Sequence, residues 1–192
     1  DSKSYTFKEA DLKAIAKVNG IASTNNFAQI EALYGLPKGA LAALVLQESG
    51  GNASAISPTG AKGLFQTTSI FREEYGLNSK SSVETQASAA AQDLAKNIKR
   101  FGSIDKALMA YNAGAGGLNS YMKGGLSASK RKEVAGYTGG WAKWFAGVNG
   151  KTSVDQNVLM PSQADILTQS LSIEEAQKAL NDNREALESK YY

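Results

Sequence analysis

The 192-residue chain contains no cysteine, no histidine and only three prolines. Without cysteine and histidine it cannot form disulfides, thiol nucleophiles, Ser-His-Asp triads or the usual zinc sites. Because proline is scarce while alanine, leucine, serine and lysine are plentiful, helices should dominate. No stretch shows convincing strand alternation, so we expect a mainly α fold.

The chain also lacks a long apolar run and a strong charge imbalance. Its best apolar run, Ala40 to Leu46, is far shorter than the roughly 18 to 20 residues that span a bilayer. The net charge is +3 and the pI about 8.9, which suits an anionic polymer but is also common without one. The chain opens at Asp1 without methionine or leader, so we expect a processed product or a fragment whose targeting signal is out of view.

Helical periodicity predicts three helices in the first 50 residues. The first ends at Asn19-Gly20, and the second runs from Asn25 or Asn26 to Tyr34. The third, from Lys38 to Ser49, is apolar on nearly every side and should therefore be buried. A polar loop over residues 51 to 70 follows, and its unusual length favours a functional role.

Beyond the loop, the pattern predicts an amphipathic helix from Glu84 to Phe101. A shorter helix capped by Ser103 should then run to Tyr111-Asn112 and dissolve over residues 113 to 117. The composition changes after Gly150, where glycine disappears, so we expect a domain over residues 1–150 and a helical extension over 151–192. Within that extension, one helix could start at Pro161-Ser162 and another at the capping box of residues 172–175.

Glu48 stands out because it ends the most apolar predicted helix, just before a Gly-Gly pair. A buried carboxylate is costly, and a negative charge at a helix C-terminus opposes the helix dipole. Both effects raise a carboxyl pKa toward neutrality, which is the state that a general acid needs. A glutamate on the wet edge of the helix would fit the position equally well, so position alone does not identify a catalyst.

Three segments between residues 40 and 137 decide the interpretation. Residues 47–52 with 55–66 (QESGGN and AISPTGAKGLFQ) resemble the first motif of the soluble lytic transglycosylase family. Residues 110–114 (AYNAG) resemble the second motif, and residues 133–137 (EVAGY) match the spacing of a third, Glu-Thr-x-x-Tyr. The chain departs from the family at Phe65, often methionine, and at Val134, often threonine.

The resemblance implies a lysozyme-like α-helical fold in which Glu48 is the only catalytic residue, with no metal or cofactor. Glu48 would protonate the β-1,4 glycosidic oxygen between N-acetylmuramic acid and N-acetylglucosamine in peptidoglycan. It would then take the proton of the muramyl C6 hydroxyl, which closes a 1,6-anhydro ring. Residues 50–70 contain no Asp or Glu, which agrees with a mechanism that needs no second carboxylate. Asp93, Asp105 or Glu133 could still approach from elsewhere.

The resemblance also implies roles for the other motif residues. Ser57 and Gln66 would bind substrate or steady the loop, Tyr111 would hold the Glu48 carboxyl, and Asn112 would shape the groove. Glu133 would bind a substrate hydroxyl or amide, or be a solvated helix residue, and Tyr137 would stack on a sugar ring. Gly60 and Gly63 should serve backbone geometry. We expect Trp141, Trp144 and Phe145 to pack in the core rather than form a carbohydrate platform.

Two other functions remain open at this stage. A muramidase would hydrolyse the same bond with water, and a glycan-binding or structural component would keep the fold without turnover. We expect peptidoglycan strands as the partner and no nucleic acid, with action in the periplasm or cell wall, as a secreted or a virion-associated protein. Lys130-Arg131-Lys132 is either a solvated face or a contact for peptide-stem carboxylates, and the tail could connect to a larger protein or assembly.

Overall fold

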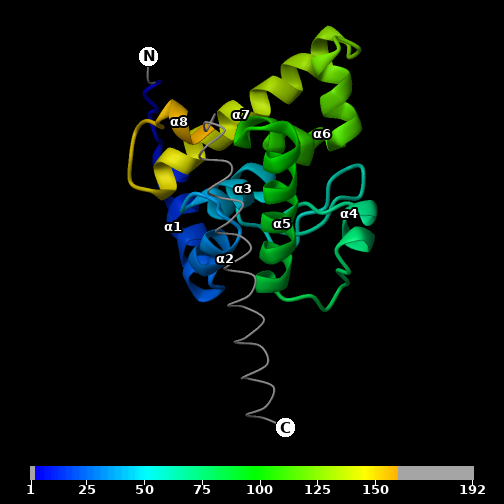
Figure 1. Ribbon diagram of the computed structural model, residues 1–192. Coiled ribbons are helices and arrows are strands. Elements are labelled where there is room, and N and C mark those ends of the chain that lie inside the picture. The colour runs from blue at the N-terminus through cyan, green and yellow to red at the C-terminus, as the bar shows by residue number, and fades with distance from the viewer. Residues whose placement is uncertain (1–2, 160–192) are drawn as a thin grey trace.

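A computed structural model describes residues 3–159, and these residues form a bundle of helices (Figure 1). The helices are α1 (Glu9–Thr24), α2 (Phe27–Leu33), α3 (Ala40–Ser49), α4 (Ser69–Glu74), α5 (Val83–Phe101), α6 (Ile104–Met122), α7 (Ala128–Val148) and α8 (Gln156–Leu159). Two isolated β-bridges, Ile56 with Lys62 and Lys62 with Thr67, are the only extended pairing among the described residues. The mainly α expectation is therefore confirmed.

Helix α3 lies in the centre of the bundle, as its apolar sequence predicts. Every residue from Ala40 to Leu46 is buried. Helices α1, α2, α5 and α7 pack around it, and α7 makes the most extensive contact. The predicted core aromatics are in place, because Trp141 is fully buried, stacks on Phe145 with ring centroids 4.8 Å apart, and donates its indole N–H to the Ala40 carbonyl at 3.2 Å.

One expected helix end is wrong and another is right only in part. Helix α1 continues past Gly20 to Thr24, because the exposed Gly20 meets no neighbour and the amide of Asn25 caps the helix by donating to the Ile21 carbonyl at 2.8 Å. Helix α6 is interrupted within the expected range, but it does not dissolve over residues 113–117. It is broken at Gly114, whose φ of 75° and ψ of 161° suit glycine, and then resumes to Met122.

The loop after α3 is long, as expected, but it ends in a helix that the sequence pattern did not indicate. Thr68 caps α4 by accepting a hydrogen bond from the Phe71 N–H at 3.2 Å. The ring of Phe71 on α4 then packs against that of Tyr75, the residue that follows α4, with ring centroids 4.6 Å apart. The polar loop thus consists of residues 50–68, held between α3 and α4.

The first residues beyond 150 lie against the domain. Val154 is buried in the main core, and the Tyr5 N–H donates to the Thr152 carbonyl at 2.7 Å. The expected helices at 161–162 and 172–175 lie outside the described residues. Among the described helices, none is both long and apolar enough to cross a membrane.

Candidate active site

Glu48 lies in the last turn of α3, where the buried helix meets the polar loop. Gly50 ends the helix with a φ of 62°, and Ser49 ties the helix end to the loop. The Ser49 hydroxyl lies 3.1 Å from the Val45 carbonyl and 2.8 Å from the Leu64 carbonyl. The Glu48 side chain is therefore held at a fixed point, partly exposed, between the core and the loop.

The Glu48 carboxyl has an altered acidity. Burial raises its pKa from 4.5 to about 7, and a hydrogen bond from the Tyr137 hydroxyl to Oε1 opposes this rise. Tyr137 is the only hydrogen-bond donor to this carboxyl among the described residues. At neutral pH the group is therefore poised between its acid and base forms, as a group that must give and later take a proton requires.

The two tyrosines make other contacts than expected. Tyr111, expected to hold Glu48, instead donates its hydroxyl hydrogen bond to the Phe65 carbonyl at 2.7 Å. Tyr137, expected to stack on a sugar, is the residue that contacts Glu48, and at 8% exposure its ring offers little surface for stacking. The reason is the α3–α7 packing, which brings Tyr137 directly over the end of α3.

Tyr111 nevertheless lies near Glu48. Burial raises its pKa well above the usual value, and the nearby negative charge of Glu48 adds to the rise. The ring of Phe71 meets that of Tyr111 edge-on at 5.7 Å. Tyr111 therefore connects α6 to α4 through its ring and to the loop through its hydroxyl. Its raised pKa keeps it a neutral phenol.

Ser57 and Gln66 both fix the conformation of the loop. The Ser57 hydroxyl accepts from the Ala61 N–H at 3.0 Å, and the Gln66 amide donates to the carbonyls of Ala55 at 3.0 Å and Gly63 at 2.9 Å. Gly60 and Gly63 have positive φ values of 87° and 80°, in keeping with a backbone role. Both polar side chains therefore hydrogen-bond to the backbone of their own loop.

Asn112 and Glu133 have no contact with Glu48. Asn112 is exposed on α6 next to the break at Gly114, and Glu133 is exposed on α7, where it pairs with Lys130 at 3.1 Å. The two departures from the family motifs are apolar and buried. Phe65 packs on Phe27 with ring centroids 5.8 Å apart, and Val134 packs in a small cluster with Leu118.

Asp93, which is buried, pairs with the half-buried Tyr75, a contact that sequence reasoning did not find. The Tyr75 hydroxyl donates to Asp93 Oδ1 at 2.8 Å, and the Asn97 amide donates to Oδ2 at 3.3 Å. Both oxygens of Asp93 are thus engaged between α4 and α5. The spacing of Asp93 and Asn97 along one face of a helix was visible in the sequence, but their partner on α4 was not.

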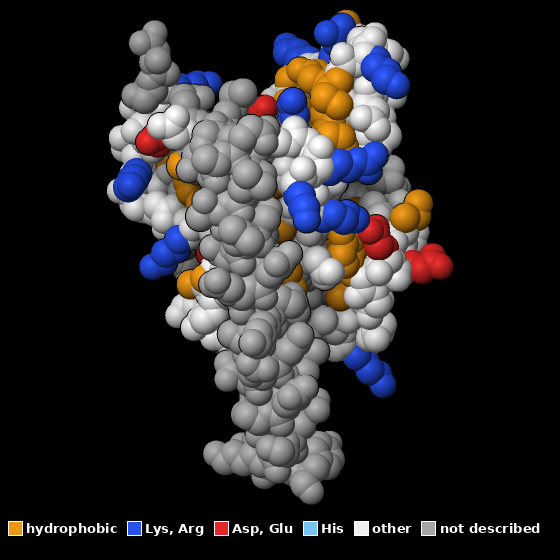
Figure 2. Space-filling model, in the orientation of Figure 1, with side chains coloured by type: hydrophobic (Ala, Val, Ile, Leu, Met, Phe, Trp, Pro, Cys, Tyr) orange, Lys and Arg blue, Asp and Glu red, His pale blue; other side chains and the backbone are white. Residues whose placement is uncertain are grey.

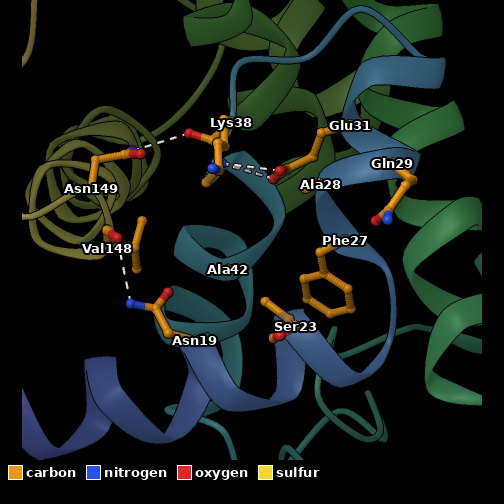
Figure 3. Close-up of a pocket in the computed structure, with 12 residues that line it drawn as sticks. Asn19, Ser23, Phe27, Ala28, Gln29, Glu31, Lys38, Ala42, Val148 and Asn149 are labelled. Atoms are coloured by element: carbon orange, nitrogen blue, oxygen red, sulfur yellow. Dashed lines mark hydrogen bonds between the residues drawn. The ribbon is translucent and has the colours of Figure 1, made fainter.

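A second buried glutamate, Glu31, lies at the opposite end of α3 and was also missed. It is only 2% exposed, and it accepts hydrogen bonds from the backbone N–H groups of Gly39, at 3.0 Å, and Leu41, at 2.8 Å. It lies beside a hollow of about 430 Å³ between α1, α2, α3 and α7. Figure 3 shows Glu31 among the residues that line this hollow. There Asn149 donates to the Lys38 carbonyl at 3.0 Å.

The polar groups of this hollow largely join helices to one another. The carboxylate of Glu31 satisfies N–H groups that the start of α3 would otherwise leave unpaired. Among the described residues, no group of three or more Asp or Glu side chains could hold a metal ion. The site around Glu48 thus consists of one carboxyl, the buried phenol of Tyr137, the half-buried phenol of Tyr111 and a loop fixed by its own side chains.

Comparison with known proteins identifies the family. The protein-family model of the transglycosylase SLT domain matches residues 25–134 of the chain. This span includes α2 to α6 and the start of α7. The chain belongs to the transglycosylase SLT domain family. The family match covers Glu48, the loop and Tyr111, while Tyr137 lies just beyond its end.

A solved structure shows the same fold. The lytic transglycosylase Slt from Pseudomonas aeruginosa, crystallised as an inactive variant with glutamine in place of a glutamate, superposes with a TM-score of 0.52 at 19% identity. The match covers 71% of this chain and 26% of the Pseudomonas protein. The SLT-domain chain thus spans about a quarter of that larger protein, and the expected lysozyme-like fold is confirmed.

Proposed function

We propose that this SLT-domain chain is a peptidoglycan lytic transglycosylase and that Glu48 is its catalytic residue. The observation that carries the proposal is the pKa of Glu48, raised by burial to about 7 beside a single donor, Tyr137. A carboxyl of this kind is protonated in a large fraction of molecules at neutral pH and can act as a general acid. Membership of the SLT family points to the substrate.

The proposed reaction uses the two oxygens of Glu48 differently. Tyr137 occupies Oε1, so Oε2 is left to carry the proton that is transferred to the glycosidic oxygen. As that bond breaks, the muramyl C6 hydroxyl attacks C1 and gives its proton to the same carboxylate. The products are a free 4-hydroxyl on N-acetylglucosamine and a 1,6-anhydromuramyl end, and Glu48 is protonated again.

The remaining motif residues support this chemistry without touching the transferred proton. Tyr111, Ser57 and Gln66 fix the loop beside Glu48 through hydrogen bonds to its backbone. Asn112 and Glu133 are the exposed motif residues and could contact the glycan, Glu133 at the expense of its ion pair with Lys130. Because peptidoglycan is the substrate, the domain would act in the periplasm or cell wall.

The runner-up function is hydrolysis of the same bond by a muramidase. A hydrolase commonly places a second carboxylate across the scissile bond to activate water. Two of the three candidates have other contacts, since Asp93 is engaged by Tyr75 and Asn97, and Glu133 pairs with Lys130. Asp105, the third, lies in the first turn of α6. These commitments favour the internal C6 nucleophile over water.

Digestion of purified sacculi tests the proposal. The native chain, Glu48→Gln and the control Glu73→Gln, which changes an exposed glutamate on α4, would be compared by mass spectrometry of the soluble products. We expect 1,6-anhydromuramyl ends from the native chain and the control, and none from Glu48→Gln. Reducing muramyl ends would show a muramidase, and full activity of Glu48→Gln would exclude Glu48 as the catalyst.

A further inference from the structure

The positive charge of the chain is concentrated in one segment. Residues 99–133 contain seven Lys or Arg and two Asp or Glu, so this segment carries +5 while the whole chain carries +3. The rest of the chain is thus slightly acidic. A cluster of one sign on part of a nearly neutral protein is typical of an electrostatic binding surface.

The fold places four of these seven cations on a projecting lobe, which we call the α6–α7 lobe and define as residues 114–133; with Glu133 the lobe carries +3. It begins at the Gly114 break, turns back after Met122 and continues into the start of α7, at the upper right of Figure 1. Figure 2 shows its Lys and Arg side chains around an apolar strip. A small cluster around Leu118 and Val134, separate from the main core, supports the lobe.

Most of the lobe's cations are unpaired. Lys130 bonds to Glu133 on the same helix, whereas Lys123 and Lys132 are exposed and have no acidic partner among the described residues. The guanidinium of Arg131 lies 6.0 Å from the ring centre of Tyr121 and likewise has no carboxylate partner there. These cations are therefore available to an external anion.

Helix α7 connects the lobe directly to Glu48. Tyr137, which bonds to Glu48, follows the lobe's α7 cations, Lys130 to Lys132, by five to seven residues, so these cations begin about 8–10 Å from it along the helix axis. In peptidoglycan, each muramyl lactyl group carries a short peptide that bears carboxylates. Since an extended peptide covers about 3.3–3.6 Å per residue, three or four residues reach from the sugar at Glu48 to the lobe.

We propose that the α6–α7 lobe binds the carboxylates of these stem peptides, so that the domain distinguishes peptide-bearing glycan from bare glycan. The inference rests on the proposed function, because it places the muramyl residue beside Glu48. Lys123, Arg131 and Lys132 supply the charge. The contact is exposed, so each ion pair is weak and sensitive to salt, and the preference comes from their sum.

The test compares binding to two soluble substrates. Labelled glycan strands would be prepared with their stem peptides uncrosslinked, or with the stems removed by an amidase, from sacculi free of teichoic acid. Affinity would be measured by fluorescence polarisation in the Glu48→Gln background. The lobe variant combines K123Q, R131Q and K132Q. The matched control combines K13Q, K80Q and K151Q, which remove the same charge from exposed sites elsewhere.

We expect the lobe variant to bind peptide-bearing strands about tenfold more weakly at low salt, while the control stays within about twofold. All proteins should bind stem-free strands equally, and a charge-keeping variant (K123R, R131K, K132R) should bind like the parent. Equal loss on both substrates, or no loss on either, would overturn the proposal. A polarisation signal that decays as strands are cut would instead show that Glu48 is not the catalyst, while the binding comparison still stands.

Discussion

A glutamate lies at each end of α3, Glu31 from α2 and Glu48 from α3 itself, and the same chemical group has opposite surroundings there. At the N-terminus, Glu31 accepts hydrogen bonds from backbone N–H groups, and the helix dipole favours its negative charge. At the C-terminus, Glu48 has one phenolic donor, and the dipole opposes its charge. Burial raises the pKa of both, but only Glu48 combines this with partial exposure to solvent.

This difference separates a structural carboxylate from a reactive one. Glu31 completes the hydrogen bonds of a helix end that would otherwise be unsatisfied, so its removal should affect folding. Glu48 satisfies no backbone N–H group among the described residues, so the burial of its charge lowers the stability of the domain. If the two glutamates differ in this way, a substitution at Glu48 should reduce activity and a substitution at Glu31 should reduce stability.

The largest expected effect is on activity. Glu48→Gln should reduce the rate of sacculus digestion by about 10³-fold, because a single group supplies both the acid and the base. Glu31→Gln, measured well below its melting temperature, should keep most of the rate. Dye release from labelled sacculi measures both rates. A comparable loss in the two variants would mean that the two ends are not functionally distinct.

The second effect is on stability and runs in the opposite direction. Glu31→Gln should lower the free energy of unfolding by about 3 kcal/mol, because an amide cannot replace a carboxylate that accepts several buried N–H bonds. Urea unfolding followed by circular dichroism measures this loss. Glu9→Gln, at an exposed position in α1, is the control and should change little. If Glu31→Gln left the urea midpoint unchanged, Glu31 would not have the structural role proposed here.

The third effect concerns pH. The folded-state pKa of Glu48, about 7, lies above its ordinary value of 4.5, so protonation favours the folded state. The contribution of Glu48 to stability is therefore fully present below about pH 4.5 and is lost as pH rises to about 7. Glu48→Gln removes this dependence, so at pH 8 the variant should be more stable than the native chain by up to about 3 kcal/mol.

Urea unfolding of both proteins from pH 4 to 8 measures this difference. At pH 4 the two should be nearly equally stable, and the gap should open as the native carboxyl ionises. A native chain that is as stable as Glu48→Gln at pH 8 would contradict a buried, unfavourable Glu48 charge.

Much of this fold was predictable from local pattern. The apolar run that became α3, the Ala-rich α5 and the Ser103 cap all follow from periodicity and capping within one element. The exceptions are instructive. Gly20 does not end α1, since a following amide caps the helix later, and Gly114 interrupts α6, which then resumes. In both cases the outcome depends on what surrounds the glycine, which its letter alone does not show.

The site was predictable only in part, for a similar reason. Glu48 is conspicuous because its position conflicts with its own helix. Which tyrosine contacts it depends on how α7 crosses α3, and this is a property of packing over 89 residues of chain. The Glu31 and Asp93 contacts also join separate elements. No local pattern indicates them, because each side chain alone looks like an ordinary surface acid on a helix.

A smaller effect should come from the single donor at the reactive end. Tyr137→Phe removes the hydrogen bond that lowers the pKa of Glu48, so that pKa should rise. Because the acid form starts the reaction, kcat/KM should fall as pH rises through about 7 in the native chain, and at a higher pH in the variant. We expect about a tenfold loss of rate at pH 6 from poorer positioning. An unshifted profile would mean that Tyr137 does not act on Glu48.

The smallest effect tests the packing that brings α7 to Glu48. A Cβ added at Gly140 would lie 2.5 Å from the Gln47 side chain on α3, so Gly140→Ala should push the helices slightly apart. Gln47 can move, which limits the expected cost to about 1 kcal/mol of stability and a several-fold loss of rate.

Gly136→Ala is the matched control on the same helix, because no atom lies within 4 Å of its new methyl. Since alanine favours helix, the control should gain about 0.5–1 kcal/mol with an unchanged rate. If the two substitutions had the same effect on rate, the close α3–α7 approach would not be what positions Tyr137.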